Sequence, residues 1–291
     1  MTTENIEKKE LVRATGLLVI EVKNSNPNGD PDRESDPRQR HDERGEISPV
    51  SFKRKLRDLI EDKEGPVWNK ISESFHPALR NEEFDILESR GRDRNKIKKE
   101  LENGGVDFKM KYWDGRVFGN TFLEEGSSDT IKTGVAQFAL GVSIAPVEIE
   151  RMTNTSKAGV QEGKDRGMAP LAYRIVQHGV YCMPFFVNPT AAVKSGCTRN
   201  DIDLLLKIIP YAYPHTASYI RPLVDIRHAW YIEHKSVLGS CSDFLLIGAL
   251  TPKKKNDPEK PSTSWVDYEV PVKLPGELQE KVEPLRDLMD Q

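Results

Sequence analysis

The chain has 291 residues, and its 43 Lys and Arg against 46 Asp and Glu give a formal net charge of -3, which does not by itself indicate a nucleic-acid binder. Its hydrophobic content of 37% is enough for a core, in one elaborated domain or two small ones. No apolar run reaches the roughly 20 residues of a membrane-spanning helix, and the polar first residues do not form a signal peptide, so we expect a cytoplasmic protein without membrane contacts.

The cysteines and the charge clusters narrow the class further. Cys182, Cys197 and Cys241 are odd in number and lack CxxC spacing, which is typical of free thiols in a cytosolic protein. Basic residues gather in two stretches, 53–57 and 90–99. A neutral average can hide one basic groove, and such a groove is what attracts phosphate.

The first predicted elements are a strand and a polar loop. Residues 1–13 look like a loose tail, and the run Leu-Leu-Val-Ile-Glu-Val at 17–22 predicts a strand buried on both faces. Asn24 to Asp32, reading Asn-Ser-Asn-Pro-Asn-Gly-Asp-Pro-Asp, is rich in turn-forming residues. Residues 30–46 have no apolar period and predict a loop.

A well-marked helix follows, from Pro49 to about Asp62. Ser48 is a good N-cap, and proline suits the first helical position because its missing N–H costs nothing there. Apolar residues recur at helical spacing and define a buried stripe, namely Phe52, Leu56, Leu59 and Ile60.

The helix also carries four cations. Lys53 and Arg57 fall on one flank of the apolar stripe, whereas Arg54 and Lys55 point further towards solvent. A solvated helix face is the ordinary interpretation of such residues. Their position beside the stripe, next to the Asn/Gly loop, favours a groove in which a nucleic-acid strand could lie.

Downstream patterns give a coarse chain order. Residues 66–103 look helical in pieces, 108–113 alternate like a strand with one wet face, and 114–119 form a glycine-bounded turn or strand end. After a polar insertion at 150–168, later segments predict a long strand at 171–187, a helix opened by the capping-box-like Thr198-Arg-Asn-Asp201, strands at 228–234 and 244–250, and a polar linker from 253. This order predicts an α+β fold, compatible with a βαββαβ ferredoxin-like core carrying insertions.

Catalytic and metal-binding signatures are weak. The chain has no Walker loop, GxGxxG, HExxH, GxSxG or paired CxxC motif. Four acidic residues alternate in the first loop: Asp30, Asp32, Glu34 and Asp36. A calcium loop needs glycine where Ser35 stands and a glutamate where His41 stands, so side-chain turns are the simpler interpretation. We therefore predict no metal and no cofactor.

Histidines offer a second possible metal site. His228 and His234 share one face of a predicted strand, and His178 lies in the middle of another. No third ligand is evident, so structural histidines are favoured.

At this point the order of motifs resembles a known family. Asn24–Asp32 followed by Ser48-Pro-Val-Ser-Phe-Lys-Arg-Lys-Leu-Arg57 is similar to the Cas-seven family of the RAMP superfamily, the backbone subunits of type I CRISPR Cascade complexes, closest to the subtype C and B branch. Three later stretches match in the same order: Asp114–Gly119, Lys132–Gln137 and Ile149–Thr153. The similarity runs unevenly over residues 14–250.

The resemblance implies a fold and an assembly. The fold is an RRM-like (ferredoxin-like) palm of residues 14–250 with an antiparallel sheet, fingers at about 66–130, a thumb hairpin at about 145–170, and a polar C-terminal extension at 251–291. Copies of the chain polymerise along a CRISPR RNA guide, each thumb reaching the next copy, and hold the guide for pairing with target DNA. Other partners are the large, small and crRNA 5′-end subunits of Cascade, and the role is non-catalytic.

The resemblance also implies site residues. Those matching guide-backbone contacts or the loop beside the RNA are Asn26, Asn28, Gly29, Ser48, Lys53, Arg54 and Arg57. Those matching finger or groove positions are Arg116, Lys132 and Gln137. Arg151, Met152 and Thr153 match the thumb wedge, where an apolar side chain occupies the gap left by a displaced base.

Two other functions stay open. Type III relatives cut target RNA with an aspartate after the first strand, where this chain has Asp30, Asp32 and Asp36. The other alternative is a self-assembling protein that binds no nucleic acid.

Overall fold

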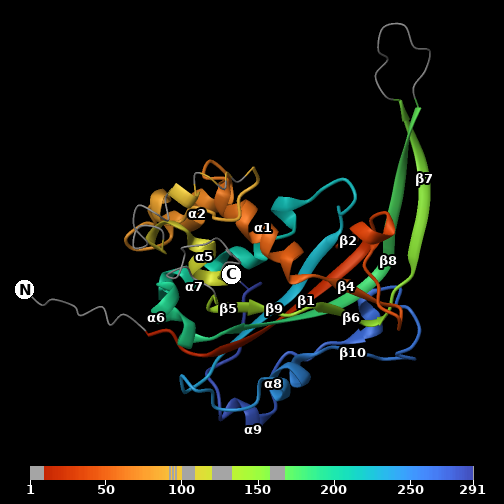
Figure 1. Cartoon of the computed structure of the whole chain (residues 1–291). Coiled ribbons are helices and arrows are strands. Elements are labelled where there is room, and N and C mark those ends of the chain that lie inside the picture. The colour runs from red at the N-terminus through yellow and green to blue at the C-terminus, as the bar shows by residue number, and fades with distance from the viewer. Residues whose placement is uncertain are drawn as a thin grey trace, which may run out of the picture.

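A computed structural model describes residues 10–91, 93, 95, 97–99, 109–119, 133–157 and 168–290, with the backbone alone for 153–157 and 168–172. The strands of its main sheet are β1 (Ala14–Ser25), β4 (Arg44–Ile47), β5 (Ala136–Phe138), β6 (Gly141–Pro146), β7 (Ile149–Lys157), β8 (Met168–Val187), β9 (Val224–Glu233) and β12 (Arg286–Asp287). They pair in the order β12-β9-β1-β8-β6-β4, and β5 and β7 also pair with β8 (Figure 1). These pairs are antiparallel, so the predicted α+β class is confirmed.

The central strand β1 is buried on both faces, as predicted. It pairs with β8 along one edge and with β9 along the other. Leu18 and Ile20 join the larger hydrophobic cluster, while Leu17 and Val19 join a second cluster. Successive side chains of a strand point to opposite faces, so the two clusters are the cores on the two faces of the sheet.

Helices cover both faces (Figure 1). On one face lie α1 (Pro49–Glu61), α2 (Pro66–Glu73), α5 (Trp113–Phe118), α6 (Ala192–Ser195) and α7 (Arg199–Ile208). On the other lie α8 (Asp243–Leu250) and α9 (Gly276–Gln279). The predicted helix over α1 is confirmed, and so is the capping box of α7, in which Thr198 and Asp201 each accept from the other's backbone N–H.

Short 3-10 helices and small strands complete the chain. The helices are η1 (Pro31–Arg33), η2 (Asn81–Glu83), η3 (Pro189–Ala191), η4 (Ile209–Tyr211), η5 (Pro214–Thr216) and η6 (Trp265–Asp267). The strands are β2 (Gly29–Asp30) and β3 (Asp36–Pro37), which pair with each other, and β10 (Lys253–Lys254) and β11 (Tyr268–Glu269), which also pair. The prediction of a plain loop over 30–46 is therefore wrong, since β2, β3 and β4 fold that segment back on itself.

The predicted strand and turn over 108–119 are also wrong. Residues 109–111 and 113–118 are helical, and Lys109 and Lys111 only imitate a strand's alternation. The rings of Trp113 and Phe118 meet edge-to-face at 5.3 Å inside the core, and Gly119 ends the helix with a φ of 76°. A positive φ favours glycine, so Gly119 is explained by its place at the end of α5.

The apolar run 244–250, predicted as a strand, is the helix α8. Leu246 and Leu250 lie one turn apart and are buried, whereas Phe244 is 87% exposed. A strand would place Phe244 and Leu246 on the same face. Periodicity alone cannot distinguish a short, continuously apolar helix from a buried strand.

The C-terminal part packs against the sheet. Tyr268, Leu274, Leu278 and Val282 are buried in the cluster that covers the face of α8. The chain then returns to the sheet edge as β12, beside β9. No helix in the described part is long and apolar enough to cross a membrane.

The assignment of α8 can be tested by two alanine substitutions. Leu246→Ala opens a cavity in the core and is expected to lower the free energy of unfolding by about 2–5 kcal/mol. Phe244→Ala removes an exposed ring and is expected to change it by about 0.5 kcal/mol or less. Chemical denaturation measures both, and equal losses would contradict the helix.

Candidate nucleic-acid interface

The Asn/Gly loop after β1 is joined to the N-terminus of α1. Asn28 Oδ1 accepts from the backbone N–H of Ser48 at 2.7 Å, and Asn28 Nδ2 donates to the carbonyl of Gly29 at 3.0 Å. Ser48 Oγ caps the helix by accepting from Ser51 N at 3.2 Å. Asn26 Nδ2 donates to the carbonyl of Ser35 at 2.8 Å. The structure therefore brings these predicted residues together, and both asparagines, 2% and 9% exposed, hold the loop in shape.

Lys53 is a half-buried cation without an anionic partner. Its Nζ lies 5.0 Å from the centroid of the Phe118 ring. No carboxylate of the described chain lies within ion-pair distance of it. Burial, followed by the charge of Arg57, lowers the pKa of Lys53 to about 8. A phosphate placed here would supply the missing counter-charge.

Arg57 lies in a buried ion pair. Its Nε donates to Asp114 Oδ2 at 2.7 Å, and the two side chains are 10% and 1% exposed. The Asp114 carboxylate also accepts from the backbone N–H groups of Leu87 and Glu88, at 2.6 and 3.1 Å. Arg57 thus fastens α1 to α5, a role that its place in the motif does not reveal.

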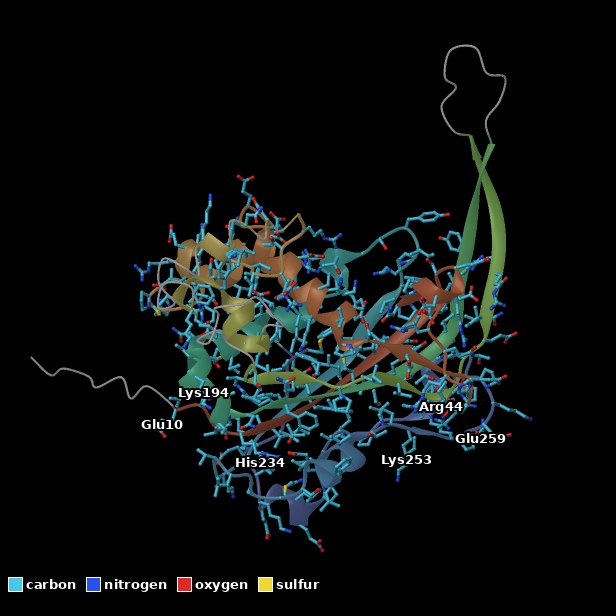
Figure 2. The ribbon with its side chains drawn as sticks, in the orientation of Figure 1. Glu10, Arg44, Lys194, His234, Lys253 and Glu259 are labelled. Atoms are coloured by element: carbon cyan, nitrogen blue, oxygen red, sulfur yellow. The ribbon has the colours of Figure 1, made fainter. Side chains whose placement is uncertain are left out.

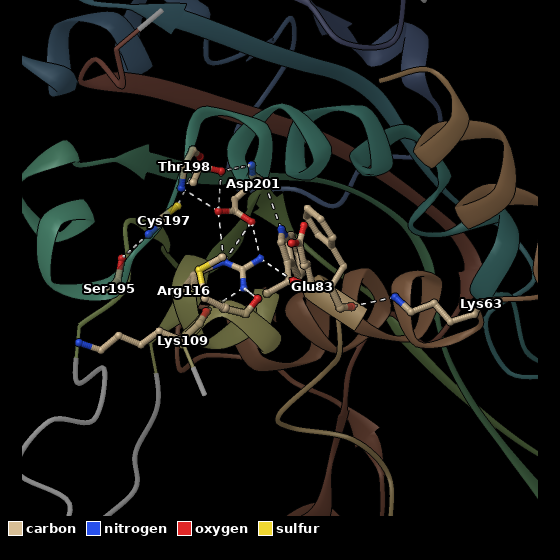
Figure 3. A network of polar contacts seen from close by, with 11 residues as sticks. Lys63, Glu83, Lys109, Arg116, Ser195, Cys197, Thr198 and Asp201 are labelled. Atoms are coloured by element: carbon tan, nitrogen blue, oxygen red, sulfur yellow. Dashed lines mark hydrogen bonds and ion pairs between the residues drawn. The ribbon is translucent and has the colours of Figure 1, made fainter. Parts of the chain in front are cut away.

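Arg116 is held even more completely (Figure 3). Its Nη2 lies 2.8 Å from Asp201 Oδ1 and 2.7 Å from the carbonyl of Glu83, and its Nε is 3.2 Å from both Asp201 oxygens. Its Nη1 donates to the carbonyls of Lys109 and Met110 at 2.8 and 2.6 Å. A phosphate could reach this guanidinium only by displacing one of these acceptors.

The other residues predicted as guide contacts or groove positions are Arg54, Gln137 and Lys132. Arg54 lies 3.8 Å from Asp58, whose carboxylate Arg90 also contacts at 2.9 Å. Gln137 is exposed on β5 and donates to the carbonyl of Gly134 at 3.1 Å. Lys132 lies outside the described residues.

The thumb prediction falls on a long hairpin of β7 and β8. Met152 is 41% exposed on β7 and stands opposite Tyr173 in the ladder. Arg151 is 62% exposed, and its Nη2 lies 2.5 Å from Asp36 Oδ2. Of Thr153 only the backbone is described, within β7.

Asp36 fastens the base of this hairpin to the first loop. Arg174 on β8 also contacts Asp36, at 3.3 Å, and it pairs with Glu34. The hydrogen bond from Arg151 lowers the pKa of Asp36 against the opposing effect of burial. Sequence reasoning treated the alternating acids of this loop as a possible metal or catalytic group and missed this role, because Arg174 lies far along the chain.

The acids and histidines make other local contacts. Asp30 caps η1 by accepting from Asp32 N at 3.2 Å. His228 lies 2.6 Å from Asp287, and His234 lies 3.2 Å from Asp243. Within the part of the chain that the structure describes, no three His, Cys, Asp or Glu side chains are grouped so as to hold a metal.

Comparisons with known proteins give one family. The family model described as "CRISPR-associated protein Cas7" matches residues 12–273. A solved "CRISPR RNA-guided surveillance complex, pre-nicking" is 12% identical with a TM-score of 0.49, covering 77% of this chain and 78% of that one. A second "CRISPR RNA-guided surveillance complex" is 15% identical with a TM-score of 0.43, covering 77% and 70%. No individually curated protein matches the chain.

The clamp at the thumb base leads to a prediction. Asp36→Asn removes the charge that both arginines share, so the backbone amides of β7 are expected to exchange hydrogen faster at neutral pH. Since the folded state lowers the pKa of Asp36, the clamp is complete at neutral pH and is lost as the pH falls below the carboxyl's ordinary value of 3.8. The wild type should therefore approach the variant in acid. Asp42→Asn, which alters an exposed acid of the same segment, is the control, and unchanged protection in Asp36→Asn would show that the clamp does not hold the thumb.

Proposed function

This chain belongs to the Cas7 family of CRISPR-associated proteins, and we propose that it binds a CRISPR RNA guide as a backbone subunit of a type I Cascade surveillance complex. Copies polymerise along the guide and present it for pairing with target DNA, together with the large, small and crRNA 5′-end subunits. The observation that carries the proposal is the environment of Lys53 on α1, the helix capped by Ser48. Lys53 is a half-buried cation, and no carboxylate of the described chain lies within ion-pair distance of it.

The proposed architecture is an RRM-like palm with inserted fingers and thumb. In its support, β1, α1, β6, β8, α7 and β9 follow in the chain order βαββαβ, and their strands are arranged β9-β1-β8-β6 in the sheet. The palm spans residues 14–250, with fingers at about 66–130, a thumb hairpin at about 145–170, and an extension at 251–291. The contact of β12 with β9 supports treating that extension as part of the same folded body.

In this proposal the predicted site residues have different roles, which follow from their positions: some contact the guide and others hold the surrounding elements in place. Lys53, at the flank of α1, meets a phosphate directly, and the loop of Asn26, Asn28 and Gly29 shapes the groove wall beside Ser48. Arg57 and Arg116 keep α1, α5 and α7 in register behind it. On the thumb, Met152 is the apolar side chain that enters the gap left by a displaced base.

We propose a non-catalytic role. The acids that a type III-like ribonuclease would need are occupied by structural contacts, because Asp36 pairs with Arg151 and Arg174 and Asp30 caps η1. Asp32, exposed in the same short helix, is the remaining candidate for such chemistry.

Lys53 gives a quantitative test. Lys53→Met keeps the aliphatic stem and should weaken binding to single-stranded RNA by about tenfold, the effect of losing a charged hydrogen bond. Since the pKa of Lys53 is about 8, wild-type affinity should fall as the pH rises through that value, while Lys53→Arg, which stays charged, falls less. Fluorescence anisotropy measures both effects. Lys70→Met, at an exposed lysine of α2, is the control, and equal affinities for all variants would refute the groove.

The ribonuclease alternative is tested on the assembled complex. The chain bound to a CRISPR RNA is incubated with complementary RNA and Mg²⁺, and we expect the target to stay intact. Cleavage that disappears in Asp32→Asn or Asp30→Asn would overturn the non-catalytic proposal.

A further inference from the structure

A second group of cations without a carboxylate partner in the described part of the chain lies on the other flank of α1. Lys55 is two residues from Lys53, so the helical turn of about 100° per residue points it to nearly the opposite side. There it faces the segment from η5 to β9, residues 214–223. In Figure 1 this segment runs from beside α1 towards the base of the thumb on β8.

Lys55 is only 4% exposed, so the prediction that it points towards solvent is wrong, and few groups balance its charge. Its Nζ donates to Thr216 Oγ1 at 3.2 Å and lies 5.0 Å from the Tyr213 ring centroid, and no carboxylate of the described chain lies within ion-pair distance. Burial, then the nearby charge of Arg221, lowers the pKa of Lys55 to about 8. Lys55 and Arg221 thus lie near each other, and the neighbouring carboxylate of Asp58 already contacts Arg54 and Arg90.

Several residues of this region carry buried polar atoms that have no hydrogen-bond partner. Buried atoms without a partner include Arg221 Nε, Asn26 Oδ1 and the Tyr213 hydroxyl. Asn26 adjoins this segment because its backbone N–H donates to the carbonyl of Ile220 at 2.8 Å. Buried polar groups are nearly always hydrogen-bonded, so the unused Arg221 Nε–H and Tyr213 hydroxyl indicate a missing acceptor, whereas Asn26 Oδ1 is itself an acceptor and needs a donor. A negatively charged acceptor would also balance the charges of Lys55 and Arg221, which have no carboxylate within ion-pair distance in the described part of the chain.

The same segment also offers an aromatic surface. Tyr219 is 58% exposed and meets Tyr173 edge-to-face at 5.0 Å, while the Tyr173 hydroxyl donates to the Tyr219 carbonyl at 3.1 Å. Tyr173 stands opposite Met152 in the thumb ladder. Cations next to exposed aromatic and apolar side chains suit single-stranded nucleic acid, whose phosphates and bases alternate along the strand.

We propose that Arg221, backed by Lys55, binds a phosphate of the guide on the thumb-facing flank of α1, and that Tyr219 contacts the adjoining base beside Met152. This inference rests on the proposed function, since it assigns a second wall to the same groove. Neither Lys55 nor the 217–223 segment is among the residues that the motifs predict as contacts.

The test uses the full chain and single-stranded RNA over a series of salt concentrations. Each phosphate contact contributes about 0.7 to the slope of log affinity against log salt for a single strand. Arg221→Gln is expected to weaken binding about tenfold and to reduce the slope by about that amount, and Lys55→Met to weaken it less. Arg221→Lys keeps the charge and should restore the slope that Arg221→Gln loses, whereas a purely structural arginine would leave the slope unchanged in both variants. Inorganic phosphate at equal ionic strength should not displace the RNA.

Control variants distinguish a failure of this inference from a failure of the proposed RNA binding. Lys253→Gln removes an exposed cation from the far side of the sheet (Figure 2) and should bind as the wild type does. If Arg221→Gln and Lys55→Met match the wild type while Lys53→Met is weakened, the second wall is refuted and the proposed function stands. If the wild type does not bind RNA, or no variant changes its binding, both proposals fail. Thermal unfolding of each variant confirms that it is folded.

Discussion

The burial of β1 on both faces is the constraint on which the rest of the structure depends. Leu18 and Ile20 pack under the helices α1 and α7, while Leu17 and Val19 pack against α8 and the C-terminal segment. Each such side chain contributes about 1.5–3 kcal/mol when it leaves water. With ladders to β8 and β9 on its two edges, β1 cannot shift by one residue without exchanging its two cores, so its register is fixed.

That fixed register determines where the polar loop lies. β1 ends at Ser25, whose hydroxyl accepts from the backbone of Leu223 at 3.0 Å, so the loop begins beside the segment leading into β9. On the other edge, β8 continues beyond its pairing with β1 and pairs with β7 in the hairpin that we propose as the thumb. Asn28 then joins the loop to the cap of α1. Segments distant in the chain therefore meet at one end of β1, where they form the walls of the proposed groove.

The elements that were predicted correctly are those whose structure depends on residues close together in the chain. The apolar run of β1, the cap and stripe of α1 and the capping box of α7 are each set by neighbouring residues, and the sequence was enough for them. α5 was missed because it is buried on all sides, and α8 because its exposed positions, such as Phe244, are as apolar as its buried ones, so neither helix shows a clear period. The ion pairs were beyond reach for another reason: Arg57 and Asp114 are 57 residues apart, and Arg116 and Asp201 are 85 apart. Spacing along the chain contains no information about such partners.

The same limit explains why the motif treats all its cations alike while the fold divides them into two kinds. Arg57 and Arg116 are buried with carboxylates and further acceptors, and the planar, permanently charged guanidinium suits such fixed positions. Lys53 is half-buried and Lys55 buried, neither has a carboxylate within ion-pair distance in the described part of the chain, and burial lowers the pKa of each. An ion pair already formed gains little from a ligand's phosphate. An unbalanced cation gains both a counter-charge and a hydrogen-bond acceptor, so in the proposed groove the cations without a carboxylate partner are the ones expected to contribute most to affinity.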